Sequence, residues 1–394
     1  MKNELHYDFL APPKIVFGWG RRREVGALAR SLGRRAYLIS GLPVDVAADA
    51  LGEIRESLLG VDIESVLVET ILHEPEVQDV DRVAQKLRGY KASHGHLLLA
   101  IGGGAAIDLA KAAAVMTTNR QSLTVADYLE QVGRNFKVVE QPMPLLAMPS
   151  TAGTGAEATR NAVISSYDPP FKKSLRDERM MPRIALIDPQ LTVSLPPKAT
   201  AASGMDAITQ LIESYISKKA QPIPRALCVQ GLRLALPALA VAVENGRTQW
   251  AREAMAHAAL LSGLALANSG LGMAHGVAPA LGIHCRVPHG LACAIMLPVT
   301  LRVNRDVCES KLAHLARAVY DLPLSMPDKD ATDHFIEQID LLCRRVNVPR
   351  RLADLGVQHD QIPGLVKSSR GTSMSGNPRD LSDGELQQIL EKML

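Results

Sequence analysis

The chain has 394 residues, 47% of them hydrophobic and 22% charged, and this length predicts two domains or one large one. Its 44 basic and 41 acidic residues leave a net charge of only +3, so the composition favours neither a nucleic-acid partner nor an anionic membrane surface. The N-terminus lacks the apolar stretch of a signal peptide, and five cysteines without a CxxC pair are typical of reduced thiols. We therefore expect a cytoplasmic protein.

The first half of the chain alternates short apolar runs with helical patterns. Strands separated by helices of this length predict parallel βαβ units. The expected strands are 14–18, 35–41, 64–70, 96–102 and 144–149, and the expected helices are 23–33, 48–59, 77–90 and 105–118.

The pattern changes after the fifth strand. Residues 165–182 are Pro-rich and charged, and one more strand, 183–188, follows them. From Leu195 onward the β signal vanishes, and 223–246, 249–270 and 382–394 are helical in period, the last with Ser382 as its N-cap. These changes place a domain boundary near Asp188–Pro197, dividing the chain into 1–190 and 191–394.

Three glycines, Gly102, Gly103 and Gly104, separate an apolar strand from a helix. Glycine lets the backbone turn sharply and approach a pyrophosphate, whose charge the free N–H groups and the helix dipole stabilise. The sequence is not the GxGxxG fingerprint, and such a turn can be purely structural. Asp108 could bond a cofactor or cap its own turn, and Lys111 is expected on the helix surface unless the loop folds over it.

A second loop, PSTAGTGAE, places Ser150, Thr151 and Thr154 after another apolar strand. Hydroxyl and backbone N–H groups in such a loop suit ribose or diphosphate oxygens, although a Ser/Thr-rich turn before a helix is the structural alternative. The two loops together favour a dinucleotide more strongly than either alone.

A candidate metal site lies in 203–290. Asp206 and Gln210 fall on one face of an expected helix, and His275 and His289 lie in a segment punctuated by glycine and proline. Imidazole nitrogen with carboxylate oxygen suits zinc or ferrous iron, whereas a lone histidine is more often a satisfied core residue. Spacing alone leaves both interpretations open.

Seven blocks in order resemble the iron-containing (group III) alcohol dehydrogenase family: GGGAAIDLAK, STAGTGAE, IDPQLTVSLPP, SGMDAITQLIESY, MAHGVAPALG, VPHGLACAIMLP and GNPRDLSDGEL. The resemblance implies a dehydroquinate synthase-like architecture, with an N-terminal α/β dinucleotide-binding domain built on a parallel sheet and an all-helical domain for metal and substrate. It also implies a homodimer, a cofactor loop at Gly102–Gly104 with Asp108, and a second loop at Ser150, Thr151 and Thr154 followed by Lys172. The implied metal ligands are Asp206, Gln210, His275 and His289.

The chain departs from the family pattern in three places. Gln210 stands where iron-dependent members have a histidine ligand, and Pro279 where many have a second histidine; His284 is the nearest substitute. Gly41 ends the second strand, where NAD-preferring members have an aspartate that repels a 2′-phosphate. NADP is therefore allowed alongside NAD.

The sequence thus predicts a metal-dependent, NAD(P)-linked alcohol dehydrogenase or aldehyde reductase that uses Fe²⁺ or Zn²⁺ to polarise a small alcohol or aldehyde. A reductase like maleylacetate reductase or glycerol dehydrogenase would keep the fold and change the substrate. A lyase like dehydroquinate synthase would use NAD without net turnover, and a nucleotide-binding protein without turnover is the alternative outside enzymes.

Overall fold

The computed structural model describes residues 6–92 and 95–394. Its chain forms two compact units, and each contains more than one stretch of sequence. The sheet unit comprises Pro12–Pro196 and Gly246–Ala256, and the helical unit comprises 6–11, Pro197–Asn245 and His257–Leu394. Helix α7 (Gln249–Ala267) therefore belongs partly to each unit.

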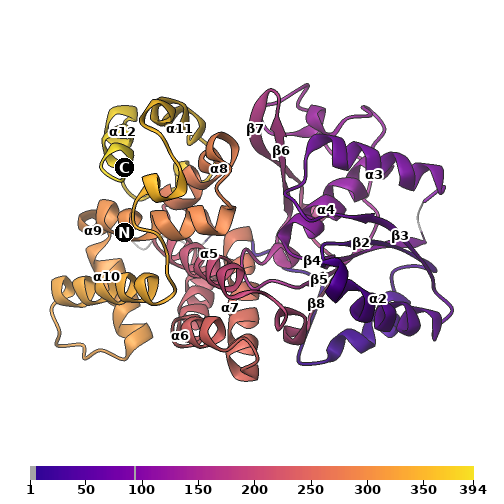
Figure 1. Ribbon diagram of the computed structural model, residues 1–394, viewed down its shortest axis with the longest axis horizontal. Coiled ribbons are helices and arrows are strands. Elements are labelled where there is room, and N and C mark those ends of the chain that lie inside the picture. Colours follow the sequence, from indigo (N-terminus) through magenta and orange to yellow (C-terminus); the bar gives the residue numbers. More distant parts are fainter. Residues whose placement is uncertain (1–5, 93–94) are drawn as a thin grey trace. The chain divides into compact units, whose positions relative to one another are not determined.

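Six parallel strands form the sheet in the order β1-β8-β5-β4-β2-β3 (Figure 1). They are β1 (Lys14–Phe17), β2 (Arg35–Ser40), β3 (Glu64–Thr70), β4 (His96–Gly102), β5 (Leu145–Pro149) and β8 (Ile184–Ile187). The predicted parallel sheet is confirmed. Its central strands are apolar on both faces, as expected where helices cover both sides.

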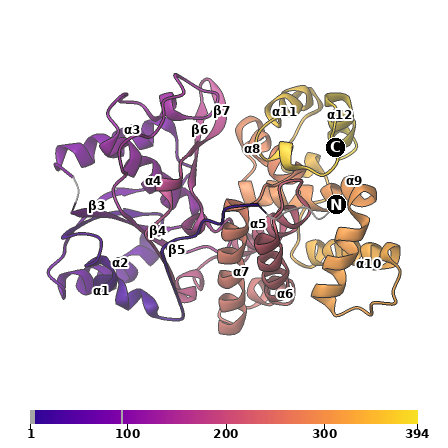
Figure 2. The same cartoon turned by 180° about the vertical axis from the view of Figure 1, so that it is seen from behind.

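Alternate residues of each central strand pack on opposite faces. Tyr37 and Ile39 of β2 join one hydrophobic core, and Ala36 and Leu38 join the other. The first core also contains residues of α3 (Val77–Gly89) and α4 (Gly104–Thr118), and the second contains residues of α1 (Val25–Ala29) and α2 (Val44–Leu59). Figure 1 shows α2 on one side of the sheet with α3 and α4 on the other, and Figure 2 shows α1 beside α2.

The charged stretch after β5 contains a hairpin that the sequence did not reveal. Strands β6 (Asn161–Tyr167) and β7 (Pro170–Arg176) pair antiparallel through seven residues each. The sequence KKSLR has neither the apolar run nor the strict alternation that predicts a strand. One attachment of the hairpin lies near α3, where Ser165 N donates to Pro75 O over 2.9 Å.

The helical unit confirms the predicted change of structure, because no strand follows Ile187 in the described part of the chain. Besides α7, its helices are α5 (Pro197–Ile216), α6 (Pro222–Glu244), α8 (Met273–Cys285), α9 (His289–Tyr320), α10 (Asp328–Arg345), α11 (Ile362–Ser368) and α12 (Asp383–Glu391). Ser382 caps α12 as predicted, since its side chain accepts from Glu385 N.

Helix α6 is long and apolar enough to cross a membrane by length and composition, although 44% of its most apolar window is buried within the protein. Buried core helices pass the same test, and α6 packs against α5 and α9. Arg233 and Pro237 interrupt its apolar sequence.

Candidate functional site

In the sheet unit, the glycine loop lies where the strand order reverses. The chain passes from β2 outward to β3 and then returns to place β4 on the other side of β2. The helices that follow β2 and β4 cover opposite faces of the sheet. In open α/β sheets this reversal opens a crevice at the carboxyl ends of the strands, where ligands bind.

Gly41 and Gly102 meet at this point because neither has a side chain. Gly41 N donates to Ile101 O over 2.7 Å, and a Cβ on Gly102 would lie 2.7 Å from the Gly41 Cα. Gly102 also has a φ of +153°, which residues with side chains rarely adopt. A Cβ on Gly41 would lie 2.9 Å from the Ala106 Cβ, so any side chain at position 41 would displace the loop.

The second predicted loop lies beside the first. Ser150 N donates to Gly102 O over 2.9 Å, and a Cβ on Gly103 would lie 3.2 Å from the Thr151 methyl carbon. The two loops therefore meet at the ends of neighbouring strands β4 and β5. Thr154 lies farther along the same loop, directly before Gly155, whose φ is +68°.

Lys111 is buried, so its expected position on the helix surface is wrong and the alternative, a loop folded over it, is confirmed. Its ammonium group donates to Ala156 O, Thr159 Oγ1 and Asn161 O, which lie just beyond β5. The sequence did not show this burial because the covering residues are far along the chain. Burial lowers the pKa of Lys111 to about 8, although Asp108 and Glu157 oppose that shift.

The other acidic and basic groups of this region make structural contacts. Asp108 Oδ2 accepts from Val163 N over 2.9 Å, and burial raises its pKa. Lys172 Nζ lies 2.7 Å from Glu74 Oε2, with its side chain only 6% exposed. Burial also raises the pKa of Glu157 to about 7.

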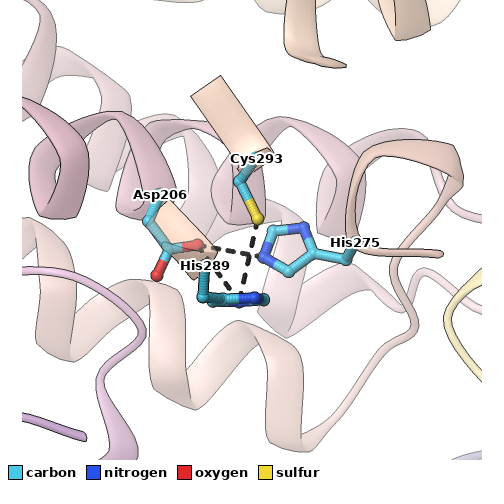
Figure 3. A group of neighbouring side chains, drawn as sticks. All are labelled: Asp206, His275, His289 and Cys293. Atoms are coloured by element: carbon cyan, nitrogen blue, oxygen red, sulfur yellow. Dashed lines mark hydrogen bonds and ion pairs between the residues drawn. The ribbon is translucent and has the colours of Figure 1, made fainter. Parts of the chain in front are cut away.

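In the helical unit, four side chains from three helices converge (Figure 3). Asp206 comes from α5, His275 from α8, and His289 and Cys293 from the first turns of α9. One donor atom from each lies within 4.8 Å of the other three. Asp206, His275 and Cys293 are at most 4% exposed, whereas the His289 side chain is 26% exposed.

The distances within this cluster suit a shared ion. His275 Nε2 lies 3.2 Å and His289 Nε2 lies 3.8 Å from Asp206 Oδ1, and Cys293 Sγ lies 3.7 Å from His289 Nε2. Figure 3 shows the Asp206 carboxylate and the Cys293 sulfur facing the two imidazole rings. Imidazole, carboxylate and thiolate are the donors that zinc and iron take in proteins.

Glu213 orients His275 from behind. Its Oε2 lies 2.7 Å from His275 Nδ1, and the carboxylate also accepts from the backbone N–H groups of Ala274 and His275 at the start of α8. This bond fixes the ring so that Nε2 faces Asp206, the arrangement in which carboxylates support metal-binding histidines. Glu213 lies seven residues after Asp206 on the same helix face.

The protonation of the cluster reflects its burial. Burial opposes the charged form of His275, but Cys293, Asp206 and Glu213 raise its pKa well above the usual value. Burial raises the pKa of the Cys293 thiol to about 12. A cation at this position would have to displace protons from both groups.

Three other residues considered from the sequence, Gln210, His284 and Pro279, are not among the four side chains of this cluster. Gln210 is buried on α5, and its Nε2 donates to Ser262 Oγ on α7 over 3.1 Å. His284 Nε2 lies 2.7 Å from Ser368 Oγ, and Pro279 lies inside α8.

Both units match one family along almost their whole length. The iron-containing alcohol dehydrogenase profile matches residues 12–189, and the C-terminal profile of the same family matches 200–394. The chain belongs to the iron-containing alcohol dehydrogenase family. The resemblance seen in the sequence is thereby confirmed.

Relatives within the iron-containing alcohol dehydrogenase family align end to end with this chain. It is 30% identical to the NAD-dependent methanol dehydrogenase of Bacillus methanolicus, covering 98% of this chain and 100% of the relative. It is 31% identical to the lactaldehyde reductase of Escherichia coli K12, covering 95% and 96%. A crystal structure of 1,3-propanediol oxidoreductase superposes with a TM-score of 0.91 at 28% identity, covering 99% and 100%.

Cys293 and Glu213 were missed by the sequence reasoning. Each had a signal, because Cys293 follows His289 by four residues and Glu213 follows Asp206 by seven, and both spacings place side chains on one helix face. Cys285 of α8 lies outside this cluster, and its Sγ donates to Gln361 Oε1 over 3.5 Å.

Proposed function

We propose that this alcohol dehydrogenase transfers a hydride reversibly between a nicotinamide cofactor and a small alcohol or aldehyde, with a divalent metal held by Asp206, His275 and His289. The convergence of these three side chains from α5, α8 and α9 is the observation that supports it best. The names of the relatives, a methanol dehydrogenase and a lactaldehyde reductase, support the same substrate class.

Each residue of the cluster has a defined task. Asp206 supplies negative charge in a buried position, His275 is oriented by Glu213, and His289 lies on the exposed side from which substrate arrives. When bound, a divalent metal polarises a carbonyl oxygen and lowers the pKa of an alcohol. Gln210 contributes a neutral amide on the same helix, as a weak ligand or by orienting water.

The cofactor is proposed to bind at the carboxyl ends of β4 and β5. Gly102, Gly103 and Gly104 let a pyrophosphate approach the start of α4, and the loop with Ser150, Thr151 and Thr154 lies alongside. Asp108 supports this site by accepting from Val163 N of the hairpin, and Lys172 supports it by pairing with Glu74.

Cofactor choice follows from the end of β2. Gly41 brings no carboxylate toward a ribose 2′ position, so a 2′-phosphate meets no repulsion from this residue. We propose that NADPH is accepted at least as well as NADH. A homodimer and a cytoplasmic location, both expected from the sequence, belong to the same proposal.

The test starts from protein purified without added metal. Bound zinc and iron are measured first, and a panel of small aldehydes and alcohols is then assayed with NADH, NADPH and their oxidised forms. We expect metal-dependent turnover that Asp206→Asn lowers on the order of 100-fold. Asp306→Asn makes the same charge change at an exposed position on α9 and should keep full activity.

The outcomes distinguish the alternatives. Net conversion of the nicotinamide excludes a lyase that regenerates its cofactor. Full activity in metal-free protein would contradict the metal mechanism. Tight cofactor binding without turnover on any substrate, with or without metal, would indicate a nucleotide-binding protein rather than an enzyme.

A further inference from the structure

We propose that Cys293 is a fourth protein ligand of the metal, and that its sulfur makes the site prefer zinc to ferrous iron. The inference rests on the proposed function only for the presence of a metal beside Asp206, His275 and His289. Cys293 is a ligand in addition to those three residues, and its sulfur determines which ion the site prefers.

The distances between the four donor atoms are close to those of a tetrahedral zinc site. Zinc binds oxygen and nitrogen at about 2.0–2.2 Å and sulfur at about 2.3 Å, so the donors of a tetrahedral site lie about 3.3–3.6 Å apart. The cluster shows 3.2 Å between His275 Nε2 and Asp206 Oδ1 and 3.7 Å between His289 Nε2 and Cys293 Sγ. Small side-chain adjustments would bring all four donors to one centre.

Helix geometry fixes the Cys293 sulfur in this position. Cys293 follows His289 by four residues in α9, so their side chains project from the same face one turn apart. Cys293 is fully buried, and its sulfur faces the imidazoles (Figure 3). The other four cysteines, Cys228, Cys285, Cys308 and Cys343, lie outside the cluster that the described residues form.

The chemistry of the donor atoms favours zinc over ferrous iron. A thiolate is a softer donor than an amide oxygen, and divalent sites of nitrogen, oxygen and sulfur bind zinc more tightly than ferrous iron. Gln210 offers only a neutral amide oxygen, whereas Cys293 offers a charged thiolate, so Cys293 provides the stronger fourth donor. Forming the metal–sulfur bond releases the thiol proton to solvent, and no electron is transferred.

The cluster stays accessible with four protein donors. His289 is 26% exposed while the other three residues are at most 4% exposed, so substrate approaches from the His289 side. Zinc sites can expand to five donors during reaction. A thiolate in the set therefore does not close the site to substrate.

The first test reads the sulfur directly. Metal-free full-length protein is titrated with Co²⁺, which replaces zinc and shows a sulfur-to-cobalt charge-transfer band in the near ultraviolet when a thiolate binds it. We expect one equivalent of Co²⁺ to produce this band and one equivalent of Zn²⁺ to abolish it. Tight Co²⁺ binding without the band would overturn the assignment of Cys293, even if no variant folds.

Variants then locate the sulfur. Cys293→Ser should abolish the band and weaken zinc binding on the order of 100-fold, measured by competition with a chromophoric chelator. Cys308→Ser is the matched control, because Cys308 is also buried in α9 but lies outside the cluster. A band that survives Cys293→Ser, or disappears in Cys308→Ser, would contradict the proposal.

Ion selectivity and turnover separate this inference from the proposed function. Zn²⁺ should bind at least about tenfold more tightly than Fe²⁺ to the wild-type protein under anaerobic conditions, and Cys293→Ser should narrow that ratio. An unchanged ratio in Cys293→Ser would refute the sulfur contribution. Turnover that depends on Asp206 but not on Cys293 would support the proposed function and contradict the assignment of Cys293 as a metal ligand.

Discussion

Replacing Glu213 with glutamine tests how the metal cluster is held together. The carboxylate is fully buried and accepts three hydrogen bonds, from Ala274 N at 2.7 Å, His275 N at 3.3 Å and His275 Nδ1 at 2.7 Å. In Glu213→Gln the amide oxygen can keep the bond to Ala274, but the NH₂ group would face the other two. The backbone N–H of His275 then loses its acceptor.

The tautomer of His275 should change as well. An NH₂ group donates to Nδ1, so a neutral ring would carry its proton on Nε2, the nitrogen that faces Asp206. A protonated Nε2 cannot bind a metal. Loss of such a supporting carboxylate costs about 10–100-fold in metal affinity, or about 1.4–3 kcal/mol.

Stability should fall even without metal. Hydrogen bonds to a charged group contribute about 1.5–3 kcal/mol each, and the 3.3 Å bond is at the weak end, so we expect a loss of about 2–3 kcal/mol. The assays are Zn²⁺ competition and thermal unfolding of the metal-free protein. Glu244→Gln removes the same charge from the exposed pair with Arg345 and should leave both zinc affinity and stability close to wild type. Zinc affinity and stability unchanged in Glu213→Gln would refute the orienting role.

Three further changes test the sheet unit. Gly102→Ala should weaken NAD(P)H binding by about tenfold or more, measured by fluorescence titration, because its Cβ would lie 2.7 Å from the Gly41 Cα. Glu157→Gln should stabilise the protein at pH 8 but not at pH 4. The pKa of Glu157 is about 7 in the folded protein against the usual 4.5, so folding favours its protonated form. This contribution to stability, worth about 3 kcal/mol, is present below pH 4.5 and is lost as pH rises through 7. Lys111→Met should destabilise the protein by about 2–4 kcal/mol and weaken cofactor binding, because three acceptors after β5 lose their donor.

Controls for these variants come from the same unit. Gly52→Ala, on α2 of the same unit, adds a Cβ that meets nothing within 4 Å, so its cofactor affinity should stay close to wild type. Unfolding at each pH can be followed by tryptophan fluorescence, because Trp19 and Trp250 both lie in the sheet unit. Equal stabilisation of Glu157→Gln at pH 4 and pH 8 would show that the carboxyl group does not titrate as inferred. Normal cofactor affinity in a folded Lys111→Met would remove its role in supporting the loop.

The sequence predicted the parallel sheet and the helical second half because both depend on local periodicity. Apolar runs such as 96–102 and helical patterns such as 105–118 carry their own signal. The hairpin of β6 and β7 was missed because its strands are half polar and gain their pairing from each other. Periodicity in one segment cannot report a partner in another.

Some residues of the candidate site were likewise predicted from the sequence, and others were not. Asp206, His275 and His289 were suggested by residue type and family order, and the structure brings them together. Cys293 and Glu213 needed knowledge of which helix faces meet, which spacing within one helix does not supply. The burial of Lys111 likewise depends on a loop about 45 residues away, so its own helix gave no hint.

The division of α7 between the two units has a consequence for dissecting the protein. The chain passes from one unit to the other at Ala11, Pro196, Asn245 and Ala256, so no single cut yields two intact pieces. A fragment that starts at Pro197 would lose the pair of hydrogen bonds between Leu10 and Asn268. A fragment that ends at Pro196 would lose Arg252, which donates to Leu195 O. Expression of either half alone should therefore give an incomplete unit, and recombinant exchange with relatives would need to move the segment around α7 together with the sheet.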